Sequence, residues 1–413
     1  EPIGALVLTH QRGTFAPADA TGRPLGDYIV WMDRRGAPIC DRLERELGID
    51  YYDRLLHPIQ PYTGFSKMIW LEERGHAAPR YLPAQSVHIA RLTGAAPACD
   101  PSTASFLGPW RPDAAVWDEA MCIQFGMPPE RLPTVLPSTT IVGELGDEVA
   151  RELRLPKGLP VVLGAADGQC AALGAGCTRP GLVMINVGTA TGVQAFCATP
   201  QRHPTRALNT APHALPGAFE MEGHTQAAGA AIDWLRALLG NPTPEELVRM
   251  AQAAPPGADG VVILPTFNGV SAPVAIPRAA ASIHGLHLRH GPAHLARAML
   301  EAICYEARWI LGSLESAVGP TDAVVLVGGF ARSPRAGQMM ADILGVPVQR
   351  AETDDAALTG AARLGRMALG LESDDLVRMH DAFEPNPELK EVYDETFARF
   401  ISAIARERGD ETA

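Results

Sequence analysis

Long apolar runs are missing from this sequence. No stretch reaches the length needed to cross a membrane, and no signal-like segment opens the chain. Basic residues are in the minority, with 35 Lys and Arg against 47 Asp and Glu and a formal net charge of −12. This balance argues against a nucleic-acid surface, although a small anionic ligand needs only local positive potential. We therefore expect neither a membrane nor a nucleic acid as a partner.

Cysteines are few, and they show no pattern. The seven cysteines are odd in number and scattered, and no C-x-x-C pair occurs. This usage favours reduced thiols in a cytoplasmic protein. The chain also lacks a repeat at solenoid period and any low-complexity tract. Its 413 residues are enough for two or three domains, each with a sizeable core.

Two common nucleotide-binding signatures are absent as well. The sequence G-x-x-x-x-G-K-[ST] does not occur, which excludes a Walker-type phosphate loop. No G-x-G-x-x-G follows the first predicted strand, at residues 4–8. A nucleotide site would therefore have to use other glycine turns.

The chain is organised around one such turn, at residues 163–176. The apolar run 161–163 predicts a buried strand that ends at Gly164, and Asp167 follows directly. In open α/β folds the carboxyl end of a strand is where ligands bind, so Asp167 is a candidate general base. The alternative is that the glycines serve turn geometry alone and that Asp167 caps the following helix.

Two further glycine turns follow predicted strands in the second half. The run 182–185 leads to Gly188 and Thr189, and the run 324–327 leads to Gly328 and Gly329. Such turns let backbone N–H groups approach an anion, and a helix start nearby adds a positive dipole end. Together with Asp167, they suggest a nucleotide and a general base on facing sides of a cleft.

The amino-terminal part shows two strand ends with polar side chains. We expect a second strand at residues 28–32 that ends at Asp33, while Gln11 and Arg12 follow the first strand. Arg12 and Asp33 could equally be solvated surface charges. The region 97–112 is rich in Pro, Ser and Gly and predicts a loop.

Several segments, taken in order, resemble the FGGY carbohydrate kinases, a branch of the actin and hexokinase superfamily. The glycine turn at 164–176 resembles the catalytic turn of that family, and N-V-G-T at 186–189 resembles its phosphate loop. The resemblance extends from about residue 3 to about residue 370. The other matching segments are Q-R-G-T at 11–14, I-V-W-M-D-R at 29–34, K-M-I-W-L at 67–71, A-G-A-A-I-D-W-L at 228–235, P-T-F-N-G at 265–269, R-A-M-L-E at 297–301, and G-G-F-A-R-S at 328–333 with Q-M-M-A-D at 338–342.

The resemblance implies an α/β fold of two actin-like (ribonuclease H-like) ATPase domains around a cleft. Residues 1–170 would form the sugar-binding domain, 171–375 the nucleotide-binding domain, and 376–413 a helical segment. It also implies ATP with Mg²⁺ as the phosphoryl donor and a sugar or polyol as the acceptor, with a second copy of the chain as a further partner. Ligands for the metal are not assigned.

The resemblance also implies roles for individual residues. Asp167 would be the catalytic base that accepts the proton of the attacked hydroxyl, in keeping with the positioning role of carboxylates in phosphoryl transfer. The substrate-binding residues would be Gln11, Arg12, Asp33 and Gln169. The ATP-binding residues would be Gly188, Thr189, Gly229, Asp233, Gly328, Gly329 and Ser333.

The sequence departs from the family pattern at three places. Gly168 stands where the family often has Gln or Asn, and Gly13 stands where glycerol kinases have Glu, which lowers the expectation of glycerol as substrate. The opening D-x-G-T-x-x-x-K hairpin, which contacts phosphate and helps to hold Mg²⁺, has no counterpart. We therefore expect an amino-terminally truncated first domain and an activity that depends on the missing segment.

The sequence leaves three functions open. The first is an ATP-dependent carbohydrate kinase, with a ketose such as xylulose or ribulose preferred and polyols retained. The second is a catalytically impaired or non-catalytic sugar-binding relative. The third, an actin-like assembly ATPase, is disfavoured because such proteins do not need the substrate turns at Arg12 and Asp33.

Overall fold

The structure is a computed structural model that describes residues 3–353 and 355–408. Among these residues, one sheet has three strands in the order β1 (Leu6–His10), β9 (Pro160–Ala166), β8 (Ile141–Glu144). The larger sheet has seven strands in the order β12 (Asn209–Pro212), β13 (Phe219–His224), β11 (Thr191–Cys197), β10 (Leu182–Val187), β16 (Ala323–Val327), β17 (Val348–Ala351), β18 (Met379–Phe383). Short strands pair as β2 (Phe15–Ala18) with β3 (Arg80–Pro83), β4 (Ala98–Cys99) with β7 (Thr134–Val135), β5 (Trp110–Arg111) with β6 (Val116–Trp117), and β14 (Val262–Leu264) with β15 (Ser282–His284).

Helices surround both sheets. The α-helices are α1 (Ala37–Glu46), α2 (Ile49–Leu55), α3 (Gly64–Glu73), α4 (Ala84–Thr93), α5 (Pro101–Leu107), α6 (Glu119–Gln124), α7 (Asp147–Leu153), α8 (Asp167–Gly174), α9 (Gly229–Leu238), α10 (Pro244–Ala251), α11 (Pro292–Val318), α12 (Pro334–Leu344), α13 (Ala356–Ala368) and α14 (Lys390–Arg408). Short 3-10 turns are η1 (Pro129–Arg131), η2 (Pro256–Gly260), η3 (Gly329–Arg332), η4 (Asp374–Leu376) and η5 (Pro387–Leu389). No helix of the described residues is both long and apolar enough to span a bilayer.

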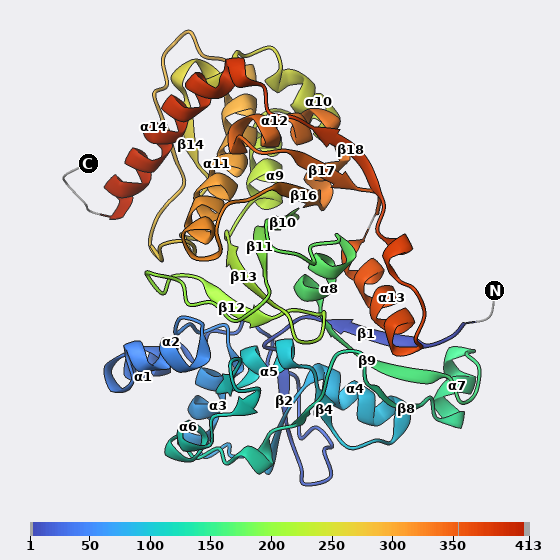
Figure 1. The fold of residues 1–413 in the computed structure, drawn as a ribbon. Helices are drawn as coiled ribbons and strands as arrows, with labels where there is room; N and C mark the ends of the chain where they lie inside the picture. Colours follow the sequence, from blue (N-terminus) through green and yellow to red (C-terminus); the bar gives the residue numbers. More distant parts are fainter. Residues whose placement is uncertain (1–2, 354, 409–413) are drawn as a thin grey trace.

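The chain folds into two halves that follow its order (Figure 1). Elements up to β9 form the lower half of the view, and the seven-stranded sheet with α9 to α12 and α14 forms the upper half. Each half has its own core: Phe15, Leu43 and Phe65 belong to the lower one, and Ile185, Ile303 and Leu326 to the upper one. Helices α8 and α13 lie between the halves.

Parallel strand pairing places the polar turns together. In the first sheet β1 runs parallel to β9 with His10 opposite Ala166, so Gln11 and Asp167 leave the sheet at the same edge. In the second sheet β10 runs parallel to β16 with Asn186 opposite Val327, which brings the following two glycine turns to one edge. Among the described residues β1 pairs only with β9, so its other edge is free of strand pairing.

Helices α8 and α13 pack at unusually short range because small residues face each other. A Cβ on Gly174 would overlap the carbonyl oxygen of Ala356, and a Cβ on Gly360 would overlap that of Cys170. This contact ties the helix that carries Asp167 to a helix from the carboxyl-terminal half.

Three predictions were wrong. The segment 376–413 is not helical throughout, because residues 379–383 form strand β18 of the seven-stranded sheet. Residues 28–32 form no strand; only Ile29 makes a bridge, to Phe15, while the side chains of Tyr28, Val30, Trp31 and Met32 are largely exposed. The predicted loop at 97–112 contains helix α5, because Asp100 caps its first turn by accepting a hydrogen bond from the Ser102 amide, and Pro101 occupies the first helical position.

Candidate active site

Asp167 stands at the junction of β9 and α8. It is the first residue of the helix and its side chain is exposed, with Oδ1 accepting a hydrogen bond from the Gly168 amide at 2.8 Å. The N-cap position belongs to Ala166, which makes no side-chain cap. The carboxylate is therefore held at the start of α8 and stays open to a ligand.

Arg12 reaches across from the first half to the second. One of its terminal nitrogens, Nη2, donates to both oxygens of Glu222 on β13, at 2.7 and 2.8 Å. The guanidinium also lies over the Phe106 ring, 4.5 Å from its centroid. Its other terminal nitrogen, Nη1, is buried and has no partner among the described residues. Arg12 is thus a fixed cation whose Nη1 keeps its N–H donors for a ligand.

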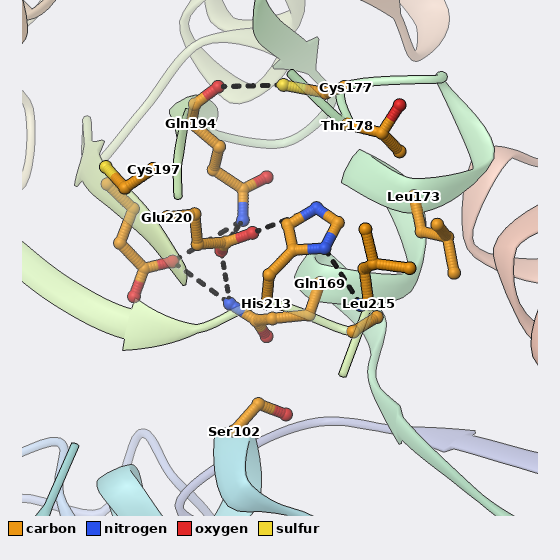
Figure 2. A network of polar contacts seen from close by, with 12 residues as sticks. Ser102, Gln169, Leu173, Cys177, Thr178, Gln194, Cys197, His213, Leu215 and Glu220 are labelled. Carbon is orange, nitrogen blue, oxygen red and sulfur yellow. Dashed lines mark hydrogen bonds and ion pairs between the residues drawn. The ribbon is translucent and has the colours of Figure 1, made fainter. Parts of the chain in front are cut away.

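Two buried glutamates on β13 form the centre of a polar network. Glu222 accepts hydrogen bonds or ion-pair contacts from Arg12, His224 and, at longer range, Asn209. Glu220 accepts from the side-chain amides of Gln169, at 2.5 Å, and Gln194, at 2.7 Å (Figure 2). The network therefore connects β13 with both Arg12 and helix α8.

Burial sets the charge state of this pair. Desolvation and the nearby charge of Glu222 raise the pKa of Glu220 to about 8. For Glu222, burial acts in the same direction, but the Arg12 and His224 charges outweigh it and hold the pKa well below its usual range. His213, whose Nε2 lies 3.9 Å from Glu220, has its pKa lowered to about 3 by burial and by the Arg363 charge. Near neutral pH, Glu222 carries the negative charge that matches Arg12.

Gln169 is fully buried, and its amide nitrogen is bonded to Glu220. It supports the start of α8 from within the protein. Asp33 is half-buried and accepts several hydrogen bonds from Arg35, including one from the Arg35 backbone amide. Both side chains are thus bonded to neighbouring protein groups, whereas Gln11 is exposed beside Arg12.

The lysine that opens the K-M-I-W-L segment orders the neighbouring loop. Lys67 is buried and donates to the carbonyl oxygens of Val30, Trp31 and Tyr62 at 2.9–3.2 Å. Burial lowers its pKa to about 8. The rings of Trp31 and Tyr62 lie 6.0 Å apart, and Trp31 stays exposed. Together they form an aromatic wall near Arg12.

Gly13 packs against this loop because it has no side chain. Its φ is +70°, and a Cβ would lie 2.7 Å from the Tyr62 carbonyl oxygen. A glutamate at this position would need a strained backbone and a shifted loop. The departure from the glycerol kinase pattern therefore has a structural counterpart.

The turn after β10 meets the start of α9. Gly188 and Thr189 are exposed, and a Cβ on Gly188 would meet nothing within 4 Å. The amides of Gly229 and Ala228 donate to the carbonyls of Gly188 and Thr189 at 2.9 and 2.8 Å. Gly229 thus lies in close contact with the turn, and α9 begins beside the turn. Asp233, one turn further along, is exposed and paired with Arg236 at 2.6 Å.

The turn after β16 lies at the same sheet edge. Gly328 has φ +86°, and Gly329 begins the 3-10 turn η3. The Ser333 side chain caps helix α12 by accepting from the Ala336 amide. A pocket of about 310 Å³ opens here, lined by Gly328, Arg332, Arg350 and Glu352 among others. Exposed glycine backbone, a helix start and arginines are groups suited to phosphate.

No group of three or more His, Cys, Asp or Glu in the described part of the chain could hold a metal ion alone. Magnesium does not need such a cage, since it often uses one or two carboxylates together with substrate phosphates. The exposed carboxylate of Asp167 fits that donor set. All seven cysteines are free, and all but Cys40 are buried.

Comparison with known families decides the class of protein. Residues 1–174 match the model of the FGGY carbohydrate kinase amino-terminal domain, and residues 183–369 match that of the carboxyl-terminal domain. The chain belongs to the FGGY family of carbohydrate kinases. It is therefore a phosphotransferase with an alcohol group as acceptor, and its fold is the two-domain, actin-like kinase fold that the sequence predicted.

Relatives of this FGGY kinase have more than one substrate. A glycerol kinase from Trichlorobacter lovleyi is 32% identical over 434 residues, spanning 98% of this chain and 85% of the relative. Among solved structures, a xylulose kinase from Lactobacillus acidophilus superimposes with a TM-score of 0.93 at 23% identity, covering 100% of this chain and 86% of that one. The xylulose kinase from Rhodospirillum rubrum has a TM-score of 0.87 at 28% identity, covering 98% and 85%.

Sequence reasoning missed Glu222, Glu220 and Tyr62. Glu220 and Glu222 stand on alternate positions of an otherwise unremarkable strand, so their spacing shows only that they share a face. Their significance depends on Arg12, which is 210 residues away in the sequence. A buried acidic pair facing a distant arginine leaves no local pattern in the sequence.

Proposed function

We propose that this FGGY kinase transfers the γ-phosphoryl group of ATP to a hydroxyl group of a ketose, of the xylulose or ribulose type, with Asp167 as general base. The observation that carries the proposal is the exposed Asp167 carboxylate beside Arg12, whose buried Nη1 has a free N–H donor. One group can take a proton and the other can bind the acceptor. A structure of Plasmodium falciparum glycerol kinase with ADP, with a TM-score of 0.86 at 22% identity over 97% of this chain, supports a nucleotide donor.

The acceptor would bind on the amino-terminal side. Arg12 donates from Nη1 to an acceptor oxygen, Gln11 is exposed next to it, and Trp31 covers the apolar face of the ring or chain. Asp167 orients the attacking hydroxyl and takes its proton as the oxygen bonds to the γ-phosphorus. The bond from that phosphorus to the bridging oxygen breaks, and ADP leaves with the electron pair.

The nucleotide would bind on the carboxyl-terminal side. Gly188, Thr189 and Gly229 face the phosphates from one turn, and Gly328, Gly329 and Ser333 from the other. Asp233 is left out of this set because Arg236 occupies its carboxylate. A bound Mg²⁺, held by phosphate oxygens, would neutralise charge on the transferred group.

The choice of a ketose rests on the departure from the glycerol kinase pattern at Gly13. Glycines at positions 13 and 168 flank Arg12 and Asp167, so no side chain projects from either position. Neither position leaves a vacant volume, because a Cβ on Gly13 would lie 2.7 Å from the Tyr62 carbonyl oxygen and a Cβ on Gly168 would lie 3.2 Å from Nε2 of Gln194. Glycerol is the second candidate, because curated relatives at 32% identity are glycerol kinases.

A coupled assay of ADP release tests the proposal. Xylulose, ribulose, glycerol and other sugars and polyols are each offered with ATP and Mg²⁺. We expect acceptor-dependent ADP release, with kcat/KM highest for a ketose. A highest value for glycerol would favour the second candidate. Absence of acceptor-dependent release across the panel would favour a non-catalytic sugar-binding relative.

A further inference from the structure

The ion pair between Arg12 and Glu222 joins the two domains at the acceptor site. Arg12 follows β1 of the amino-terminal domain, and Glu222 lies on β13 of the carboxyl-terminal domain. The Arg12 side chain is only 10% exposed and that of Glu222 is not exposed at all. A buried charge of this kind needs a partner, and each of these two residues supplies it to the other.

Glu222 holds Arg12 in one orientation. Both carboxylate oxygens accept from the same nitrogen, Nη2, which leaves Nη1 as the donor for a ligand. Stacking on Phe106 restricts the guanidinium plane from the other side. Without Glu222 the long arginine side chain would regain several rotamers, and the free donor would lose its fixed direction.

The same strand also reaches the helix of the catalytic base. Gln169, two residues after Asp167, donates to Glu220 at 2.5 Å and lies 3.4 Å from Glu222. Figure 2 shows Gln169 and Gln194 pointing toward Glu220 from opposite sides. Strand β13 therefore supports the acceptor-binding arginine through Glu222 and the start of α8 through Glu220.

We propose that Glu222 is a positioning residue for phosphoryl transfer, one that aims the Nη1 donor of Arg12 at the acceptor across the domain boundary. The proposal rests on the proposed function, since it takes Arg12 to be the acceptor-binding group. Because the two residues belong to different domains, Arg12 is correctly placed only while the domains stay in the arrangement seen here. Acceptor binding and the relative placement of the two domains are thereby coupled.

The test is a double-mutant cycle with Glu222→Gln, Arg12→Gln and the double variant. For Glu222→Gln we expect the KM for the acceptor to rise at least tenfold while the KM for ATP changes less than twofold. In the Arg12→Gln background, adding Glu222→Gln should change kcat/KM for the acceptor less than threefold, because no arginine remains to be positioned. Arg12→Gln alone leaves the buried Glu222 carboxylate without its cation and should lower the Tm. Adding Glu222→Gln should restore part of the lost Tm.

Asp53→Asn is the matched control. Asp53 pairs with Arg206 at 3.1 Å and also joins the two domains, but it lies on the surface and does not touch Arg12. We expect its acceptor KM to stay within twofold of the wild type. A rise as large as that of Glu222→Gln would show that general loosening of the domains is the cause, and would overturn the proposal.

Other outcomes are equally decisive. An unchanged acceptor KM in a folded Glu222→Gln protein would reduce Glu222 to a structural role. If Glu222→Gln does not fold, the comparison of Arg12→Gln with the double variant tests the proposal. A further tenfold loss of kcat/KM for the acceptor in the double variant would mean that Glu222 acts through another group. A wild type that phosphorylates no acceptor would remove the proposed function and this proposal with it, whereas active wild type with additive effects removes this proposal alone.

Discussion

Asp167 combines an exposed carboxylate with a defined backbone position between β9 and α8. Replacement by Asn keeps the shape and removes the proton acceptor. We expect kcat to fall by about 10²-fold or more, the usual scale for loss of a general base. The Kd for ATP, measured by calorimetry, should stay within a few-fold.

Asp147→Asn is the control for that variant, because Asp147 is an exposed carboxylate on α7 paired with Lys157, outside the site. Its kcat should equal that of the wild type. If Asp167 acted only on the helix, Asp167→Asn would cost at most about 1 kcal/mol of stability and leave turnover intact. Full activity of Asp167→Asn would remove this residue from the mechanism.

Glu220 gives the protein a pH-dependent stability. Burial and the charge of Glu222 raise its pKa from 4.5 to about 8, so the folded protein keeps a proton that the unfolded chain loses. This contribution is fully present below pH 4.5 and is lost as the pH rises toward 8. Glu222 titrates in the opposite sense, and its contribution is lost only under acid conditions.

Glu220→Gln removes the Glu220 titration. We expect the Tm of the variant, taken relative to that of the wild type, to increase between pH 5 and pH 8. Differential scanning fluorimetry at both pH values measures this difference. A difference that does not change with pH would mean that Glu220 is not protonated in the folded protein.

At the scale of elements, the two neighbouring glycines in the turn from β16 into η3 have different roles. Gly328 has φ +86°, and a Cβ there would lie 2.6 Å from the Val187 carbonyl oxygen. Gly329 has ordinary φ, and its nearest atom to a Cβ is 4.0 Å away. Gly328 is therefore required by the fold, while Gly329 leaves space for a ligand.

We expect Gly329→Val to fold with a Tm close to that of the wild type and to bind ATP at least tenfold more weakly in calorimetry, because its branched side chain fills the phosphate approach. Gly328→Val, its matched partner, should instead lose stability, by roughly 1–3 kcal/mol or more for the strained backbone. Unchanged ATP affinity in Gly329→Val would show that the nucleotide binds elsewhere.

At the scale of the whole molecule, specific hydrogen bonds join the domains. The Tyr52 hydroxyl donates to the Leu208 carbonyl at 2.8 Å and accepts from the His203 amide at 3.1 Å. Close by, the Thr210 amide donates to the Leu56 carbonyl at 2.7 Å. Helix α2 is thereby attached to the segment before β12, and the relative placement of the domains depends on these contacts.

Tyr52→Phe removes the hydroxyl from this junction and leaves a buried amide and carbonyl without their partner. We expect a loss of roughly 1–3 kcal/mol in unfolding free energy, the range for an unsatisfied buried polar group. Denaturant unfolding measures it, and Tyr28→Phe, whose ring is partly exposed, is the control. Equal stability of the two variants would show that the junction contributes little.

Residues close together in the sequence were enough to establish the family, the α/β class and the position of Asp167. Glycine turns after apolar runs, and their order along the chain, are local signals that survive without coordinates. The same reasoning failed at residues 28–32, where apolar composition predicted a strand but only Ile29 pairs, in a single bridge to Phe15 of β2. It also missed α5, whose proline-rich start hides a well-formed cap.

The tertiary structure alone decided how the site is assembled. Arg12 and Glu222 are 210 residues apart, and Asp53 and Arg206 are 153 apart, so no periodicity or spacing could have paired them. Only the fold shows that Gln169 turns inward to Glu220. The physical reason is that a sequence pattern reflects only neighbours along the chain. The burial, charge state and partners of a side chain depend on segments that are distant in the sequence and meet in the fold.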